Sequence, residues 1–191
     1  MFSTQIERLA DVIIENKLSK TNDREIIIYG LTTGIEIIFN IFTTMILGFI
    51  FGLVFESLVF LIAFSMIRTY AGGYHCVKAI NCYLFSSTIV ILVLSIVKFT
   101  PDKYIFIISV ILLMLSLPIL LKFMPVDTKT KSLDADEKKY FRKKAVTNLL
   151  IEIVIIIALF YISEYSFGYV VSLSIMVTAF LIVLGKIDNA L

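Results

Sequence analysis

The chain alternates between long apolar tracts and short polar segments. A helix needs about 20 apolar residues to cross a bilayer core of about 30 Å. Residues 26–67 form a tract long enough for two spans, which we place near 26–47 and 49–67 because Gly48 and Gly52 interrupt it. Four more spans are expected near 82–97, 104–123, 147–163 and 167–185. The pattern therefore predicts an all-α, polytopic membrane protein with six transmembrane helices.

Polar segments separate these spans in pairs and leave a single integral-membrane domain. Its expected parts are an amphipathic cytoplasmic helix (1–25), two spans (26–67), a short loop (68–81), two spans (82–123), a basic segment (124–146) and two spans (147–185). In the basic segment, acidic residues come first and basic residues follow. That order complements a helix dipole, so we expect the fifth helix to begin before it enters the membrane.

The N-terminal segment has the periodicity of a surface helix. Phe2, Ile6, Leu9 and Ile13 recur at steps of three and four residues and share one helical face. Its mixed charges do not fit a secretory signal peptide, in which a basic region precedes an apolar core. The helix either packs on the rest of the protein or lies in the membrane interface, and the two arrangements do not exclude each other.

Composition narrows the functional class. Hydrophobic residues make up 59% of the 191 residues and charged residues 17%, whereas a soluble domain is about 45–50% apolar and about 25% charged. These values exclude an ordinary cytosolic enzyme, and two cysteines are too few for a disulfide scaffold. The net charge of +2 gives no support to nucleic-acid binding, so we expect no nucleic-acid partner.

The distribution of basic residues predicts the orientation in the membrane. With six spans, 15 of the 17 Lys and Arg residues fall on one side, and only Lys98 and Lys103 fall on the other. The positive-inside rule then places both termini and both long polar segments in the cytoplasm, with the spans in the plasma membrane. A five-span arrangement would split the basic residues between the two sides, so the bias supports six.

Three carboxylates, Glu36, Glu56 and Glu152, lie within the apolar tracts. A charge in hydrocarbon is costly, so each must be protonated, paired, close to the interface or turned toward a cavity. A proton- or ion-coupled transporter uses such residues. An ordinary helix bundle with slightly displaced helix ends would contain them too. A transporter and a non-enzymatic membrane assembly protein are therefore the alternatives to an enzyme.

The candidate chemistry is concentrated in residues 68–82. This short segment holds the only histidine, His75, and both cysteines, Cys76 and Cys82. A histidine beside a thiol can accept its proton and return it, which is the pairing found in cysteine catalysts. Two other interpretations remain: a structural histidine with two small buried thiols, and a metal site, although the spacing matches no usual structural zinc pattern. We expect no metal and no cofactor.

Spacing constrains which cysteine can work with His75. On one continuous helix, His75 and Cys82 would lie about 10.5 Å apart along the axis, too far for contact. The segment must therefore bend, and the Gly72–Gly73 pair permits backbone conformations closed to other residues. Asn81 is an expected N-cap that would place Cys82 in the first helical turn, where the helix N-terminus stabilises a thiolate. Cys76 is the rival, but adjacent side chains point apart in most backbones.

The sequence Arg-x-Tyr-Ala-Gly-Gly-x-His at 68–75, with Cys82 after six intervening residues, resembles the signature of the accessory gene regulator B (AgrB) family. Members of this family are membrane-embedded cysteine endopeptidases of Gram-positive quorum sensing. The resemblance extends over the whole chain, through its size, amphipathic N-terminus, spans and basic segment. It implies that His75 is the catalytic histidine and Cys82 the nucleophile. Cys76 departs from the pattern, because relatives often have a small residue such as alanine there.

The resemblance also implies a substrate, a short precursor peptide called AgrD with an amphipathic helix, an internal cysteine or serine, and an acidic tail. Cys82 would cleave before the tail and form a thioester, which the internal residue displaces to close a thiolactone or lactone ring. Six basic residues are candidates for binding the tail: Arg68, Lys138, Lys139, Arg142, Lys143 and Lys144. Those of the basic segment also fit an anchor at an anionic lipid surface. The expected partners are the precursor and the bilayer, and a homodimer is left open.

Overall fold

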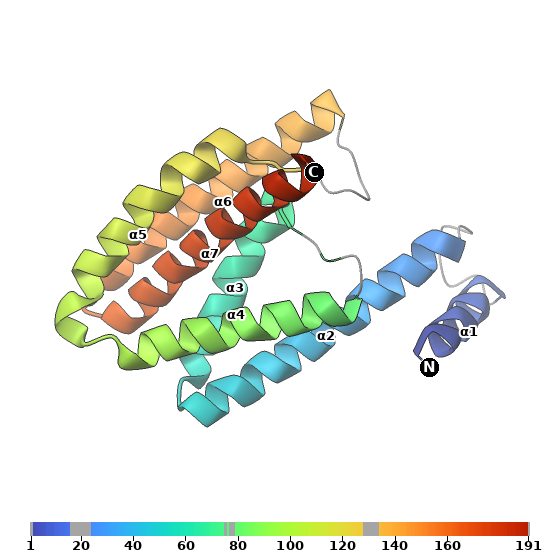
Figure 1. Ribbon diagram of the computed structural model, residues 1–191, viewed down its shortest axis with the longest axis horizontal. Coiled ribbons are helices and arrows are strands. Elements are labelled where there is room, and N and C mark those ends of the chain that lie inside the picture. The colour runs from blue at the N-terminus through green and yellow to red at the C-terminus, as the bar shows by residue number, and fades with distance from the viewer. Residues whose placement is uncertain (1, 16–23, 75, 77–78, 128–133, 191) are drawn as a thin grey trace. The chain divides into compact units, whose positions relative to one another are not determined.

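The computed structural model describes residues 2–15, 24–74, 76, 79–127 and 134–190, and these residues form seven helices (Figure 1). The helices are α1 (Phe2–Glu15), α2 (Arg24–Phe51), α3 (Val54–Ala71), α4 (Ala79–Phe99), α5 (Asp102–Phe123), α6 (Ala135–Tyr161) and α7 (Tyr165–Ala190). Helices α2 to α7 are long and apolar enough to cross a membrane. The prediction of an all-α protein with six transmembrane helices is confirmed.

The chain divides into two compact units, Met1–Thr43 and Thr44–Leu191. In the first unit, Arg24 donates a hydrogen bond of 2.8 Å from Nε to Asp11 Oδ1, and this bond keeps the pKa of Asp11 below its usual value. The predicted apolar face of α1 is divided, because Ile6 is buried whereas Leu9 is 51% exposed. An exposed leucine on this helix is consistent with a contact to lipid.

The turn between the first two spans differs from the prediction. We expected a break near Gly48, but α2 continues to Phe51 and the chain reverses at Gly52, which has a φ of 72°. Gly48 is instead a packing position, because a Cβ added there would overlap the Ser57 side chain of α3. A sequence pattern cannot distinguish a glycine that ends a helix from one that lets two helices approach.

Helix α6 begins in the polar segment, as the charge order predicted. The Asp134 carboxylate accepts a hydrogen bond of 2.7 Å from the Glu137 backbone N–H, and the Glu137 carboxylate accepts one of 3.4 Å from the Asp134 backbone N–H. This capping box satisfies two backbone donors at the helix start. The helix is therefore formed for two to three turns before its apolar part begins.

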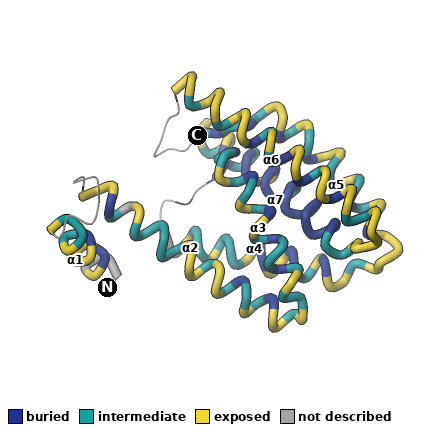
Figure 2. Tube along the Cα trace, turned by 180° about the vertical axis from the view of Figure 1, so that it is seen from behind, coloured by how far each residue is buried: buried dark blue, intermediate teal, exposed yellow. Residues whose placement is uncertain are grey.

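Helix α7 is the centre of the second unit and contacts α3, α4, α5 and α6. Buried residues are concentrated along this helix, which is mostly dark blue in Figure 2. One hydrophobic cluster joins α7 to α3, α5 and α6 around Ile67, Leu149 and Ile175. A second joins it to α3, α4 and α5 around Phe60, Leu94 and Tyr169. Because α7 packs against four helices, groups near its C-terminal end are fixed relative to the end of α3 and the end of α5.

Candidate active site

Cys82 lies in the first turn of α4 and is partly buried. The N-cap expected at Asn81 is wrong, because Ala79 and Ile80 are already helical. Asn81 lies inside the first turn, where its backbone forms the helix and its side chain is exposed. Cys82 nevertheless keeps the predicted place near a helix N-terminus, where backbone N–H groups and the helix dipole favour negative charge.

The segment that leaves α3 is held by backbone hydrogen bonds on two sides. Val126 donates from its backbone N–H to the carbonyl of Ala71 at 2.9 Å, and Tyr74 donates to the carbonyl of Leu181 at 2.9 Å. Gly72 forms an isolated parallel bridge with Val126. The segment is thus clamped between the residues that follow α5 and the C-terminal half of α7.

Gly72 and Gly73 provide the bend that the sequence predicted. Their φ angles are 69° and 117°, in a region that other residues rarely adopt. Both glycines are also enclosed: a Cβ on Gly72 would overlap the carbonyl oxygen of Val126, and a Cβ on Gly73 would overlap the guanidinium of Arg68. The Gly-Gly pair is therefore required by conformation and by space.

The guanidinium of Arg68 is hydrogen-bonded to the backbone of this segment. Its Nη1 donates to the carbonyl oxygen of Gly72, and its Nη2 donates to the carbonyl oxygen of Tyr74. The guanidinium also interacts electrostatically with Cys82. Arg68 is a candidate for substrate binding from the sequence, and in the structure its side chain is bonded to the carbonyls of the loop.

Tyr74 interacts with both cysteines. Its phenol is hydrogen-bonded to Cys76, and this bond, with electrostatic interactions with Cys76, Asp188 and Cys82, raises the pKa of Tyr74 above its usual value. The Tyr74 ring packs edge-on against Phe85 of α4, with the ring centres 5.7 Å apart. Sequence reasoning missed Tyr74 and Asp188, because neither has a spacing that points to the thiols.

The catalytic histidine predicted by the resemblance, His75, lies outside the described residues. Its neighbour Tyr74 is described, and it is bonded to Leu181 of α7 and packs against Phe85 of α4. Among the described residues, no three His, Cys, Asp or Glu side chains are grouped as metal ligands. The metal interpretation included His75 and is not tested by this grouping.

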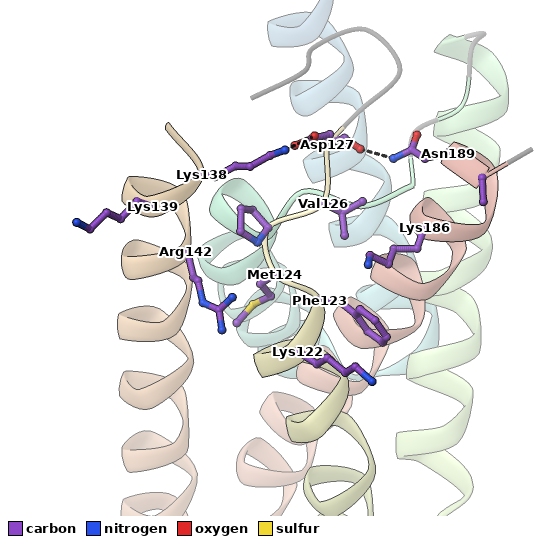
Figure 3. Close-up of a pocket in the computed structure, with 12 residues that line it drawn as sticks. Lys122, Phe123, Met124, Val126, Asp127, Lys138, Lys139, Arg142, Lys186 and Asn189 are labelled. Carbon is purple, nitrogen blue, oxygen red and sulfur yellow. Dashed lines mark hydrogen bonds and ion pairs between the residues drawn. The ribbon is translucent and has the colours of Figure 1, made fainter. Parts of the chain in front are cut away.

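The predicted tail-binding residues separate into two sets. Lys138, Lys139 and Arg142 line a groove of about 840 Å³ (Figure 3). Lys143 and Lys144 are exposed and are not among the residues that line it. Lys122 and Lys186 line the same groove. From the sequence, these two lysines contribute only to the count of basic residues that predicts the orientation in the membrane. Their spacing in the sequence does not predict that these two lysines lie near Lys138, Lys139 and Arg142, because they come from the ends of α5 and α7.

The carboxylates within the spans have unlike surroundings. Glu56 accepts a hydrogen bond of 3.2 Å from Ser166 Oγ, at the start of α3 and α7. Glu152 is 1% exposed, and neither of its carboxylate oxygens has a hydrogen-bond partner in the described part of the chain. A buried, unpaired carboxylate is expected to carry a proton in a membrane bundle.

Comparisons with known proteins identify the family of the chain. The family profile described as accessory gene regulator B matches residues 6–182. An AgrB-like protein of Clostridium perfringens (strain SM101 / Type A) is 32% identical over 185 residues, which cover 92% of this chain and 86% of the relative. AgrB-like protein 2 of C. perfringens (strain 13 / Type A) is 33% identical over 185 residues, covering 90% and 86%.

No solved structure shows significant similarity to the chain. The family match, by contrast, covers most of its length and includes the whole segment from Arg68 to Cys82. This multi-pass membrane protein therefore belongs to the accessory gene regulator B family.

Proposed function

We propose that the protein is a membrane cysteine endopeptidase that removes the acidic tail of an AgrD-like precursor peptide and promotes ring closure. The observation that carries this proposal is the position of Cys82 in the first turn of α4, with the guanidinium of Arg68 near enough to interact with it electrostatically. A helix N-terminus and a neighbouring positive charge both stabilise a thiolate, which is the reactive form of cysteine.

In the proposed reaction, His75 accepts the proton of the Cys82 thiol and the sulfur attacks the carbonyl carbon of the bond before the tail. The C–N bond then breaks, His75 returns the proton to the departing amine, and the peptide remains on Cys82 as a thioester. The thiol of the precursor's internal cysteine attacks this thioester and releases the ring product. Its proton returns through His75 to Cys82, so the enzyme is regenerated.

Ring closure competes with hydrolysis, because water can attack the same thioester. Exchange between two thioesters is nearly balanced in energy, so the outcome depends on keeping water from the acyl group. In the structure Cys82 is partly buried, and the segment beside it is pinned to the bundle through Tyr74 and Leu181. We propose that this enclosure gives the internal nucleophile its advantage.

The acidic tail is proposed to dock on Lys138, Lys139 and Arg142, which line the groove. The exposed apolar residues of α1 are proposed to meet the amphipathic helix of the precursor at the membrane surface. A homodimer remains a proposal that the family resemblance suggests.

Co-expression tests the proposed function directly. The chain is produced with the small open reading frame beside its gene, and the peptide products are weighed. The proposal expects a ring peptide that is one water lighter than its linear form, together with the released tail. An unprocessed precursor in the presence of correctly inserted protein would contradict it.

The proposed orientation gives a labelling prediction. Both termini and the polar segments around the thiols should be cytoplasmic, because 15 of 17 basic residues lie on that side. A single cysteine introduced at Ser132, in a variant without native cysteines, should react with a membrane-impermeant maleimide only after the cells are opened. Labelling on intact cells would contradict the six-span orientation.

Gly185 provides a test of the pinned loop. A Cβ on this glycine of α7 would lie 2.6 Å from the Tyr74 backbone nitrogen, and such overpacking costs about 1–3 kcal/mol. We expect Gly185→Ala to lower the processing rate by about tenfold or more, with unchanged protein in the membrane. Gly34→Ala is the matched control, because a Cβ there has no neighbour within 4 Å. Equal activity of the two variants would show that the loop does not depend on this contact.

A further inference from the structure

The groove is built from three helix ends that are distant in sequence. Its lining comes from the end of α5 and the residues that follow it, the first turns of α6, and the last turns of α7. Figure 3 shows these side chains around the Met124–Val126 segment, which passes between the helices. The groove thus has a backbone floor and walls that carry long basic side chains.

The charges of the groove are strongly unbalanced. Five basic residues line it and only one carboxylate does: Lys122, Lys138, Lys139, Arg142 and Lys186 against Asp127. The carboxylate is already used, because Asp127 Oδ2 forms an ion pair of 2.8 Å with Lys138. The ion pair shows that a carboxylate can be seated in this groove by a lysine.

The other four cations have no carboxylate partner in the described part of the chain. The ammonium of Lys186 lies 4.4 Å from the centre of the Phe123 ring, and that of Lys122 lies 5.4 Å from the same ring. Arg142 donates to the carbonyl oxygen of Leu121 at 3.0 Å. These contacts are weaker than pairing with an anion, so the groove retains the capacity to bind several negative groups.

The floor of the groove is joined to the candidate active site. Val126 lines the groove, and its backbone N–H is bonded to the carbonyl of Ala71, immediately before the Gly72–Gly73 bend. In a peptide held in the groove, the part that contacts Val126 would therefore be separated from the segment that leads to the thiols only by the Val126 backbone. This continuity favours a peptide over a lipid headgroup, which would need no connection to the loop.

We propose that this groove binds an acidic peptide segment, and that Lys122 and Lys186 are specificity-determining residues for it together with Arg142. The identity of the ligand as the precursor's tail rests on the proposed function, but the binding itself does not require catalysis. Carboxylates of the peptide would pair with the cations that now contact Phe123 and Leu121. The tail would thereby be held beside the loop while the bond that precedes it reaches Cys82.

The test is a binding measurement on the full-length protein in detergent, with a fluorescent synthetic peptide rich in glutamate and aspartate. The groove variant is Lys122→Glu/Lys186→Glu. The control is Lys143→Glu/Lys144→Glu, which makes the same change in net charge with exposed residues outside the groove. We expect the Kd to rise at least tenfold in the groove variant and less than threefold in the control. A rise in salt should weaken the wild-type complex, because exposed charges are screened within about 10 Å at 0.1 M.

Three outcomes would overturn the proposal. Equal losses in both double variants would overturn the proposal in favour of unspecific charge attraction. Normal peptide binding, with loss of co-purified anionic phospholipid from the groove variant alone, would overturn it in favour of a lipid site. If the reversed charges prevent insertion, Lys122→Gln/Lys186→Gln replaces them, with the same comparison and an expected loss of about threefold to tenfold. Neutral variants that bind the peptide as tightly as the wild type would then overturn the proposal.

The Cys82→Ala variant separates this inference from the proposed function. It should bind the acidic peptide with unchanged Kd, because the thiol is not a groove residue. Processing by Cys82→Ala with normal peptide binding would remove the proposed mechanism and leave the groove intact. Loss of binding in the groove variant, with slow but complete processing at high substrate concentration, would support both.

Discussion

Replacement of Cys82 by alanine is expected to abolish precursor processing, by at least about 10⁴-fold, because the variant lacks the group that forms the acyl-enzyme. Cys76→Ala is expected to keep at least about one third of the activity. Cys82 lies in the first turn of α4 and interacts electrostatically with the guanidinium of Arg68, whereas Cys76 is hydrogen-bonded to the phenol of Tyr74. The rates are measured by mass spectrometry of the tail released in membranes.

Both variants must be present in the membrane in equal amounts for the comparison to hold, and quantitative immunodetection provides this control. The reverse result, with Cys76→Ala inactive and Cys82→Ala active, would assign the nucleophile to Cys76. Full activity in both would remove the cysteine mechanism. In that case loss of function on Glu152→Gln would favour the transporter alternative, because Glu152 is the buried, unpaired carboxylate of the bundle.

Arg68→Gln is expected to have the second largest effect, a fall of at least about 100-fold in kcat. The arginine donates to the carbonyls of Gly72 and Tyr74, and hydrogen bonds from a charged donor contribute about 1.5–3 kcal/mol each. Loss of both bonds releases the segment that carries His75, and each 1.36 kcal/mol of barrier is about tenfold in rate. Arg68→Lys should recover little, because an ammonium lacks the planar fork that reaches two carbonyls.

A second readout separates a positioning role from a general loss of structure. Arg68→Gln should slow the alkylation of Cys82 by iodoacetamide at pH 7 at least fivefold, measured in the Cys76→Ala background, because the thiolate loses its positive neighbour. Thr69→Ala is the control, since within the described residues the Thr69 hydroxyl donates only to the carbonyl of Ser65, in the preceding turn of α3. Unchanged alkylation together with lost activity would limit Arg68 to holding the loop.

The helices could be predicted from the sequence because bilayer thickness and polar caps leave few alternatives. The start of α6 followed from the order of charges around Asp134 and Glu137, and the bend at Gly72–Gly73 followed from residue type. The end of α2 did not follow, because Gly48 and Gly52 have the same local character. Only the contact of Gly48 with Ser57 distinguishes the packing glycine from the turn glycine.

The site was predictable only where its residues are close in the chain. His75 and Cys82 were found through one short segment and a family signature, and Asn81 was misplaced because helix starts are poorly defined by sequence. Lys122 and Lys186 join the groove through the packing of α5 and α7. No periodicity within either helix contains that information. Tyr74 and Asp188 approach each other for the same reason, since α7 is packed against the end of α3.

The most direct test of the central claim is to trap the acyl-enzyme. The wild-type protein is incubated with a precursor whose internal cysteine is replaced by alanine, so that ring closure cannot occur, and the reaction is quenched in acid. After proteolysis, mass spectrometry should find the tail-less precursor fragment joined as a thioester to the peptide that contains Cys82. Attachment to the peptide with Cys76, or release of the tail with no thioester on either cysteine, would contradict the account.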